Sequence, residues 1–201
     1  MVNVGILLFD EVEVLDFAGP FEVFSTASRL ALRQQPNMPA PFTVFTISRA
    51  DRVQVRGGLF VLPQFRFDDH PPLDLLIVPG GDVAAELNKP DVIAWITAQS
   101  KTARLVASVC TGVFLIGKAG LLDGKRATTH WEDIADLRRL SPSTDVIENE
   151  RWVDEGSVIT SAGISAGIDM SLHLVSRLAG LDLAVRTARQ MEYETGLRGN
   201  Q

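Results

Sequence analysis

Hydrophobic residues along the chain form short continuous runs that alternate with longer, helically spaced patterns. Continuous runs are typical of strands buried on both faces of a sheet, and helical spacing places apolar side chains on one face of a helix. The patterns predict strands over 2–9, 42–48, 73–81, 104–109 and 126–130, hairpins over 53–63 and 145–163, and helices over 17–34, 90–103, 111–118, 131–140, 164–180 and 182–194. Strands alternating with helices indicate an α/β fold, with a mostly parallel sheet sandwiched between helices.

Composition narrows the class of protein. The 201 residues are 46% hydrophobic, which is enough for a sizeable core, and no repeat or linker divides them, so we expect a single domain over 1–201. The net charge of -6 argues against nucleic acid or an anionic membrane surface as partner. The longest apolar stretch, 105–117, is shorter than the ~20 residues of a membrane span. The amino terminus lacks a basic segment, so we expect no signal peptide and a cytoplasmic location.

The only cysteine, Cys110, lies between a predicted strand and a predicted helix. Ligands of α/β sheets bind beyond the carboxyl ends of strands, which is where this residue is expected. A following helix favours a thiolate, and this predicts a thiol pKa lowered from its usual value. The arrangement has the mechanics of a nucleophile elbow, although the sequence is not G-x-S-x-G. The alternative is an inert cysteine buried in the core.

Five segments of the chain, in order, carry a family resemblance: LLFDEVEVLDFAGPFEVF, GGLFVLPQFRFDDHPPLDLLIVPGG, ASVCTGVFLIGKAGLLDGKRATTHW, ITSAGISAGIDMSLHLV and ARQMEYE. They resemble the ThiJ/PfpI branch of the class I glutamine-amidotransferase-like superfamily, which implies a flavodoxin-like fold. Within that branch the chain is most similar to isonitrile hydratases and to the amino-terminal ligand domains of certain AraC-type regulators. Together the five segments cover nearly the whole chain.

The resemblance implies a role for each of several residues. Cys110 matches the family nucleophile, and Asp16 matches the carboxyl group beside it in isonitrile hydratases. The loop with Gly80 and Gly81 matches the one that supplies a backbone donor of the oxyanion hole, with the Thr111 N–H as the second donor. Read without the resemblance, Asp16 is a helix N-cap, the glycines form a turn, and Thr111 bonds locally to the backbone.

Further residues are expected near the thiol. By family analogy the loop after the last strand places Gly163 and Ile164 there. His130 is an alternative base, because histidine titrates near neutrality, or else a structural residue at a helix start. Protease-like members of the superfamily carry histidine directly after the nucleophile, and the threonine at this position argues against peptidase activity. We expect no metal, because the pair Asp169 and His173 lacks a third ligand.

The resemblance implies a hydratase that adds water to small isonitriles, giving N-formamides through a covalent thioimidate on Cys110, with protonated Asp16 as the acid and no cofactor. The resemblance also implies a homodimer. One alternative is a ligand or redox sensor related to the AraC-type regulators, although only about twenty residues follow Gly180, too few for a DNA-binding domain. Another is a glyoxalase-like enzyme acting on small carbonyl compounds.

Overall fold

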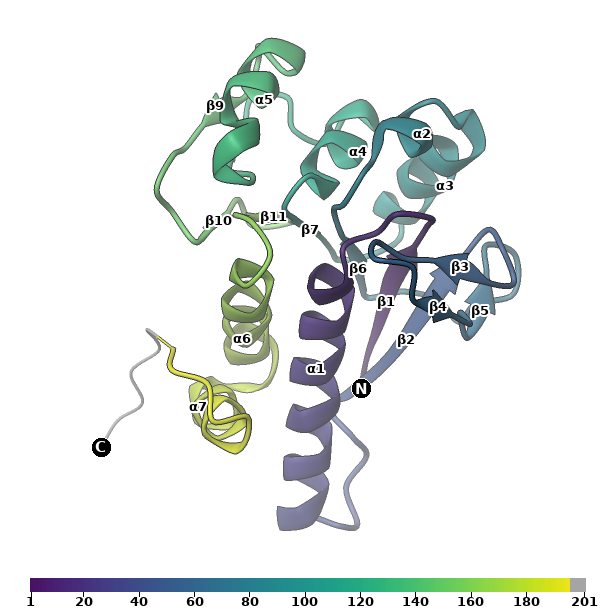
Figure 1. Ribbon diagram of the computed structural model, residues 1–201. Helices are drawn as coiled ribbons and strands as arrows, with labels where there is room; N and C mark the ends of the chain where they lie inside the picture. The colour runs from purple at the N-terminus through teal and green to yellow at the C-terminus, as the bar shows by residue number, and fades with distance from the viewer. Residues whose placement is uncertain (196–201) are drawn as a thin grey trace.

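The computed structural model in Figure 1 describes residues 1–195, so the last six residues of the expected domain lie outside the described part. Each of the five predicted strand ranges contains a strand, in several cases a shorter one than expected. The strands are β1 (Val2–Leu8), β2 (Phe42–Ser48), β3 (Val53–Gln54), β4 (Phe60–Val61), β5 (Phe65–Arg66), β6 (Leu75–Val78), β7 (Leu105–Val109), β8 (Arg126–Ala127), β9 (Asp145–Val146), β10 (Trp152–Asp154) and β11 (Val158–Ser161).

Within the described residues, seven strands form the main sheet in the order β10-β11-β7-β6-β1-β2-β5. Every neighbouring pair is parallel except the hairpin of β10 and β11. The chain runs from β1 outward to β2 and β5 and then returns to the other side of β1 as β6. Ligands in open α/β sheets bind at such a reversal of strand order. The sheet therefore has its expected binding edge at the carboxyl ends of β1, β6 and β7.

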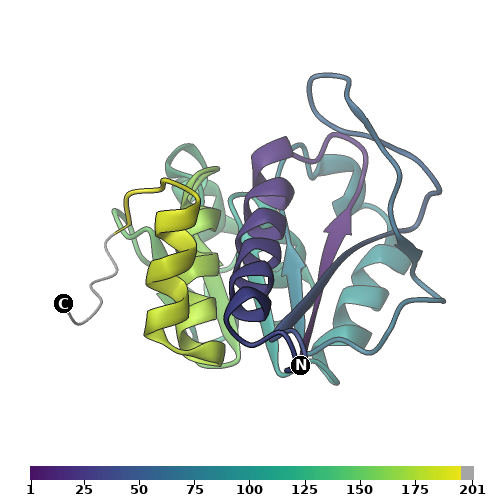
Figure 2. The same ribbon diagram turned by 90° about the horizontal axis from the view of Figure 1, so that it is seen from below.

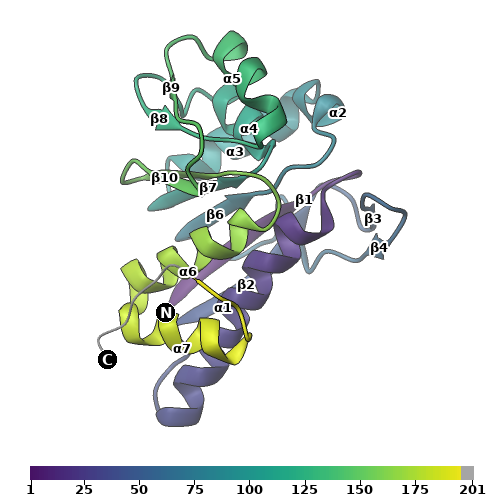
Figure 3. The same ribbon diagram turned by 60° about the vertical axis from the view of Figure 1, so that its left-hand side comes forward.

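Helices cover both faces of this sheet. The helices are α1 (Val14–Gln34), α2 (Ala84–Leu87), α3 (Pro90–Ser100), α4 (Gly112–Lys118), α5 (Ile134–Leu140), α6 (Ala166–Ala179) and α7 (Leu181–Gln190). Figure 2 shows α1, α6 and α7 side by side on one face, with a teal helix on the other. Figure 3 places α5 with β8 and β9 on the side of α3 and α4. The predicted α/β sandwich is confirmed.

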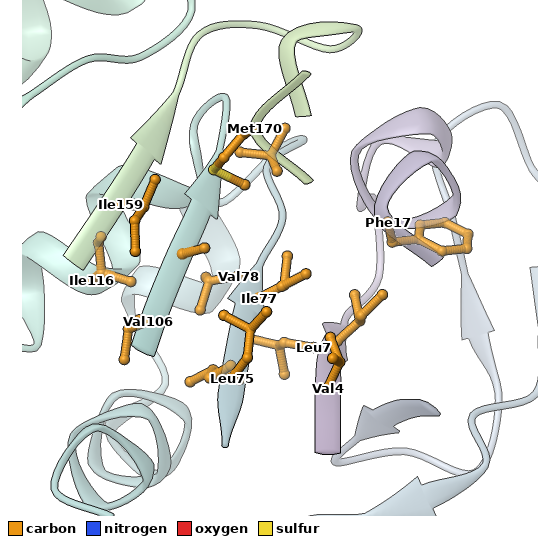
Figure 4. Packing of buried hydrophobic residues seen from close by; sticks show 14 of the residues in the cluster. Val4, Leu7, Phe17, Leu75, Ile77, Val78, Val106, Ile116, Ile159 and Met170 are labelled. Carbon is orange, nitrogen blue, oxygen red and sulfur yellow. The ribbon is translucent and has the colours of Figure 1, made fainter. Parts of the chain in front are cut away.

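The core fills the space between the sheet and its helices. Strands of the central sheet are buried on both faces, as their continuous apolar runs predict. Figure 4 shows side chains of the sheet meeting those of the flanking helices, including Val4, Ile77, Val106, Ile159, Ile116 of α4 and Met170 of α6. Among residues 1–195, no helix has both the length and the apolar character needed to cross a membrane.

The hairpin predictions are confirmed in part. β3 and β4 pair antiparallel around a turn that contains Gly57 and Gly58, both with positive φ. β10 and β11 also form the expected hairpin. The start of the predicted segment 145–163 does not belong to that hairpin, because β9 pairs parallel with β8 instead. Alternating side chains show that a segment is extended but do not identify the strand it pairs with.

Two boundaries near the binding edge also differ from the prediction. α1 begins at Val14, three residues earlier than expected, so Pro20 lies inside the helix and not in its first turn. The predicted strand 126–130 ends at Ala127, and the chain then enters a short 3-10 helix, Trp131–Asp133. Both differences change the setting of residues that were expected at the site.

Candidate active site

Cys110 lies in the turn between the end of β7 and the start of α4. Its backbone φ is 55°, in the left-handed region, which costs a non-glycine residue about 1–3 kcal/mol. Two contacts hold this conformation. The Cys110 N–H donates to the carbonyl of Ser161 at 3.2 Å, and the hydroxyl of Thr129 donates to the Cys110 carbonyl at 2.9 Å. The side chain is nearly buried, with 7% of the residue surface exposed.

Two glycines allow the turn to approach its neighbours closely. A Cβ on Gly112, the first residue of α4, would lie 2.1 Å from the carbonyl oxygen of Val78 at the end of β6. A Cβ on Gly80 would lie 2.6 Å from the Thr111 nitrogen and 2.9 Å from Asp16 Oδ2. Because real Cβ atoms do not come this close, only glycine lets the β6 loop touch both the nucleophile turn and the carboxyl group.

Asp16 is fully buried in the first turn of α1. Its Oδ2 accepts the Gly80 N–H at 3.0 Å, its Oδ1 is buried without a hydrogen-bond partner among the described residues, and its charge acts on the nearby Cys110 thiol. The interpretation of Asp16 as an N-cap is wrong, because the N-cap position is Glu13 and that residue makes no side-chain cap bond. The carboxyl group instead bridges the β6 loop and the thiol.

Loop-to-loop bonds place Asp16 beside Gly80. The segment before α1 runs against the loop after β6, where the Glu13 N–H donates to the Gly80 carbonyl at 2.9 Å and the Asp82 N–H donates to the Glu11 carbonyl at 3.0 Å. Burial raises the pKa of Asp16 to about 7, against the opposing effect of the Gly80 hydrogen bond. Near neutral pH this carboxyl group therefore exists in both protonation states.

The predicted lowering of the Cys110 pKa is wrong. Burial, with the adjacent Asp16 charge as a second cause, raises the pKa of the thiol to about 12. The backbone N–H groups of Thr111 and Ile164 face the sulfur and act in the opposite direction, but they do not overcome the loss of hydration. α4 is only seven residues long. The resting thiol is therefore neutral, and Asp16 is the nearby group able to take its proton.

Thr111 closes the other side of the turn. Its hydroxyl accepts the Gly81 N–H at 2.9 Å and donates to the Gly81 carbonyl at 2.8 Å. The Gly81 N–H, expected as an oxyanion donor, is thus already bound to this hydroxyl. Thr111 bonds neither the sulfur nor its own helix through Oγ1, but fastens the β6 loop to the nucleophile turn. The backbone donors that face the sulfur are Thr111 N–H and Ile164 N–H.

The loop between β11 and α6 places Gly163 and Ile164 as the resemblance implied. Ile164 has a φ of 44°, so a second strained residue borders the sulfur. A Cβ on Gly163 would lie 2.1 Å from the His130 ring, so glycine lets that ring approach the loop. His130 and Ile164 both line the cavity that contains Cys110. The structure therefore brings the expected residues together around the thiol.

His130 is held by the element that follows it. Its Nδ1 accepts the Glu132 N–H at 3.3 Å, capping the 3-10 helix, as the structural interpretation predicted. An Nδ1 that accepts a hydrogen bond carries no proton, so the neutral ring carries its proton on Nε2. In this tautomer Nε2 donates and does not accept, which leaves Asp16 as the better candidate for a base.

A cavity of about 400 Å³ opens beside the thiol. Its lining includes charged residues that the sequence did not single out: Glu13, Arg56, Glu132 and Asp133. Arg56 comes from the β3–β4 hairpin, and its backbone N–H donates to the Val12 carbonyl at 3.0 Å. No local pattern marks these residues, since each reaches the cavity only through tertiary contacts. Within residues 1–195, no cluster of three or more His, Cys, Asp or Glu side chains is arranged to hold a metal.

The chain matches the DJ-1/PfpI family over residues 2–177, which include the nucleophile turn and both loops around it. The chain belongs to the DJ-1/PfpI family. Among relatives in this family, the isonitrile hydratase of Pseudomonas putida is 37% identical over 194 residues, which are 96% of this chain and 78% of the relative. The transcriptional regulator GbdR of Pseudomonas aeruginosa is 29% identical over 193 residues; the match covers 96% of this chain but about half of the regulator.

Solved structures of the DJ-1/PfpI family have the same fold. A ThiJ/PfpI family protein from Pseudomonas syringae superposes with a TM-score of 0.84 at 26% identity, covering 99% of this chain and 78% of that one. DJ-1beta of Drosophila melanogaster has a TM-score of 0.78 at 18% identity, covering 96% of this chain and 98% of that one. The arrangement of the central sheet and its helices is thus shared well beyond recognisable sequence identity.

Proposed function

We propose that this protein is a cysteine-dependent hydratase that converts small isonitriles to N-formamides without a cofactor. The observation that carries the proposal is the pairing of Cys110 with the buried carboxyl group of Asp16, whose charge acts on the thiol, beside an open cavity. The similarity to the isonitrile hydratase of Pseudomonas putida supports the reaction. The strained cysteine between β7 and α4 corresponds to a nucleophile elbow.

In the first step the sulfur of Cys110 bonds to the terminal isonitrile carbon, which also gains a proton. With the thiol neutral and Asp16 ionised, the carboxylate accepts the thiol proton as the S–C bond forms and passes it to the carbon. The product is a thioimidate, R–N=CH–S–Cys110. The mechanism expected from the resemblance starts from a Cys110 thiolate and a protonated Asp16. The two starting states differ only in which of the two residues carries the proton.

In the second step water attacks the thioimidate carbon. Asp16 takes one proton from that water and returns it to the sulfur as the C–S bond breaks, and the second proton of the water moves to the nitrogen. The products are R–NH–CHO and the free thiol, so the net reaction is the addition of one water. The backbone N–H groups of Thr111 and Ile164 stabilise negative charge on the sulfur during both steps. His130 Nε2–H is available to donate from the cavity wall.

Formamide production from a simple isonitrile tests the proposal. Mass spectrometry should detect the N-formamide with the wild-type chain and none above background with Cys110→Ala. Asp16→Asn, which can still accept the Gly80 N–H, should reduce kcat by at least about a hundredfold, in the range of a lost acid–base group. Turnover that survives in Cys110→Ala would remove the nucleophile from the proposal.

A sensor is the second candidate, favoured by the match to GbdR along nearly the whole chain. An AraC family regulator from Pseudomonas putida also superposes with a TM-score of 0.75 at 23% identity. The same assay separates the functions when methylglyoxal is included. Formamide indicates the hydratase, and lactate indicates a glyoxalase-like enzyme. Ligand-induced thermal stabilisation or an oxidised Cys110 without turnover indicates a sensor.

A further inference from the structure

The cavity beside Cys110 has an unbalanced set of charges. Its lining residues include three with carboxyl groups, Glu13, Glu132 and Asp133. The basic residues in the lining are Arg56 and His130. Asp16 does not line the cavity, but its charge also acts on the thiol. A molecule that enters the cavity thus meets more negative than positive charge before it reaches the thiol.

Within residues 1–195, the two carboxylates of the 3-10 helix, Glu132 and Asp133, have no lysine or arginine at ion-pair distance. Arg56 lies 3.7 Å from Glu13 and pairs with it. Within residues 1–195, the one basic side chain at ion-pair distance from Glu132 or Asp133 is His130, at 3.8 and 3.6 Å from its Nδ1. In the uncharged form of the ring, in which Nδ1 accepts the Glu132 N–H, His130 offers these carboxylates no positive charge.

These two carboxylates differ in their relation to the thiol. Asp133 is about one-third exposed at its side chain, and its charge is among the causes that raise the pKa of Cys110, so its field reaches the sulfur. Glu132 is about two-thirds exposed and lies at the open side of the cavity. Together they impose a negative potential from the entrance to the reacting atom.

We propose that the site selects substrates whose non-reacting end is cationic, such as an ammonium or amidinium group, and discriminates against anionic ones. For the reaction itself this inference rests on the proposed hydratase function, but the charge selection is a property of the cavity. A unit charge about 8 Å from a carboxylate across a wet cavity changes binding by roughly threefold, favourably for a cation and unfavourably for an anion. Two carboxylates together then separate cationic from anionic substrates by well over tenfold.

Alkylation of Cys110 measures the selection without any assumed reaction. The probes are 2-bromoethylamine, iodoacetamide and iodoacetate, which are cationic, neutral and anionic, and each loses halide as its carbon bonds to the sulfur. Rates with N-acetylcysteinamide correct for intrinsic reactivity. In the wild-type chain, the corrected alkylation rate of the cationic probe should be at least about ten times that of the anionic probe. Because salt screens the carboxylates, 0.5 M salt should reduce this ratio.

Variants distinguish the effect of the Glu132 and Asp133 carboxylates on the alkylation rates from the effect of the charges on Cys110 and Asp16. Glu132→Gln combined with Asp133→Asn should lower the corrected ratio by about tenfold or more, and Glu132→Gln alone by several-fold. Asp182→Asn, which removes an exposed charge on α7, is the matched control and should leave the ratio unchanged. A double variant whose corrected ratio equals that of the wild-type chain overturns the proposal. If the double variant does not fold, a wild-type ratio in Glu132→Gln overturns it.

Isonitriles of matched size with an amine, a neutral or a carboxylate end complete the test. A higher kcat/KM for the amine, lost in the double variant, extends the selection to catalysis. Charge-selective alkylation without formamide from any of the three leaves the selection standing and rejects the hydratase. If all three isonitriles give formamide with equal kcat/KM, and the corrected alkylation rates are also equal, the charge selection is rejected and the hydratase function stands.

Discussion

The hydroxyl of Thr129 donates a 2.9 Å hydrogen bond to the carbonyl oxygen of Cys110, and both residues are buried. The same carbonyl lies 3.5 Å from the Val113 N–H, a long contact, so Thr129 is its main donor. A residue at a φ of 55° keeps that conformation only where its surroundings hold it. Thr129, which comes just before the cavity residue His130, therefore holds Cys110 in this backbone conformation.

Thr129→Val, which has nearly the same shape, should reduce kcat for formamide production by about tenfold with little change in KM. The variant leaves a buried carbonyl without its main donor, which costs about 1–3 kcal/mol, and frees the nucleophile turn to relax. Thr129→Ser restores the donor and should recover most of kcat. A valine variant that is less stable but has wild-type kcat would show that the hydroxyl supports the fold alone.

Gly80→Ala should lower both kcat and the rate of Cys110 alkylation by at least tenfold. The added methyl group would lie within 2.6–2.9 Å of the Thr111 nitrogen and of Asp16 Oδ2, so the β6 loop has to move away from both. Gly120→Ala is a suitable control, because its Cβ position is open although its φ is positive. Alkylation of Gly80→Ala at the wild-type rate would contradict the close approach seen here.

Ionisation of Asp16 should make the protein less stable as the pH rises. Its folded-state pKa of about 7 is above the 3.8 of the unfolded chain, so the stabilising contribution is complete below pH 4 and is lost as the pH rises through 7. At about 1.4 kcal/mol per pKa unit, this loss is on the order of 4 kcal/mol by pH 8. Urea unfolding at pH 5 and pH 8 should show most of this difference in the wild type and little of it in Asp16→Asn. The exposed-site variant Asp182→Asn should behave as the wild type.

The pH dependence of kcat/KM should show the same group. The pair of Cys110 and Asp16 is reactive when it carries one proton, so activity should rise with an apparent pKa near 7 and level off towards pH 9. The falling limb belongs to loss of the last proton and lies well above pH 9. Profiles measured from pH 5 to 9 should lose the rising limb in Asp16→Asn. If activity instead falls as the pH rises through 7, the reactive form has both Cys110 and Asp16 protonated, which contradicts the proposed mechanism.

The order of the elements and the position of Cys110 between a strand and a helix follow from the local sequence pattern. Continuous apolar runs identify the buried strands, helical spacing identifies the covering helices, and Cys110 stands at the boundary between the two. Once strands and helices alternate, the parallel sheet and its binding edge follow from general rules of chain connection. Specific roles for Asp16 and Ile164 came from the resemblance to a family, since their residue types alone equally suggest a helix cap and an ordinary apolar loop residue.

Packing decided the chemistry of the site. Asp16 and Gly80 are 64 positions apart, and only the folded loops bring the carboxylate to its donor. Thr129 and Asp133 likewise reach Cys110 through the chain that follows α4. The raised pKa of the thiol has the same origin, because the loss of hydration that causes it depends on all the segments that close around the sulfur. A sequence records the ionisable groups, but their distances and their contact with water are fixed only when distant segments pack together.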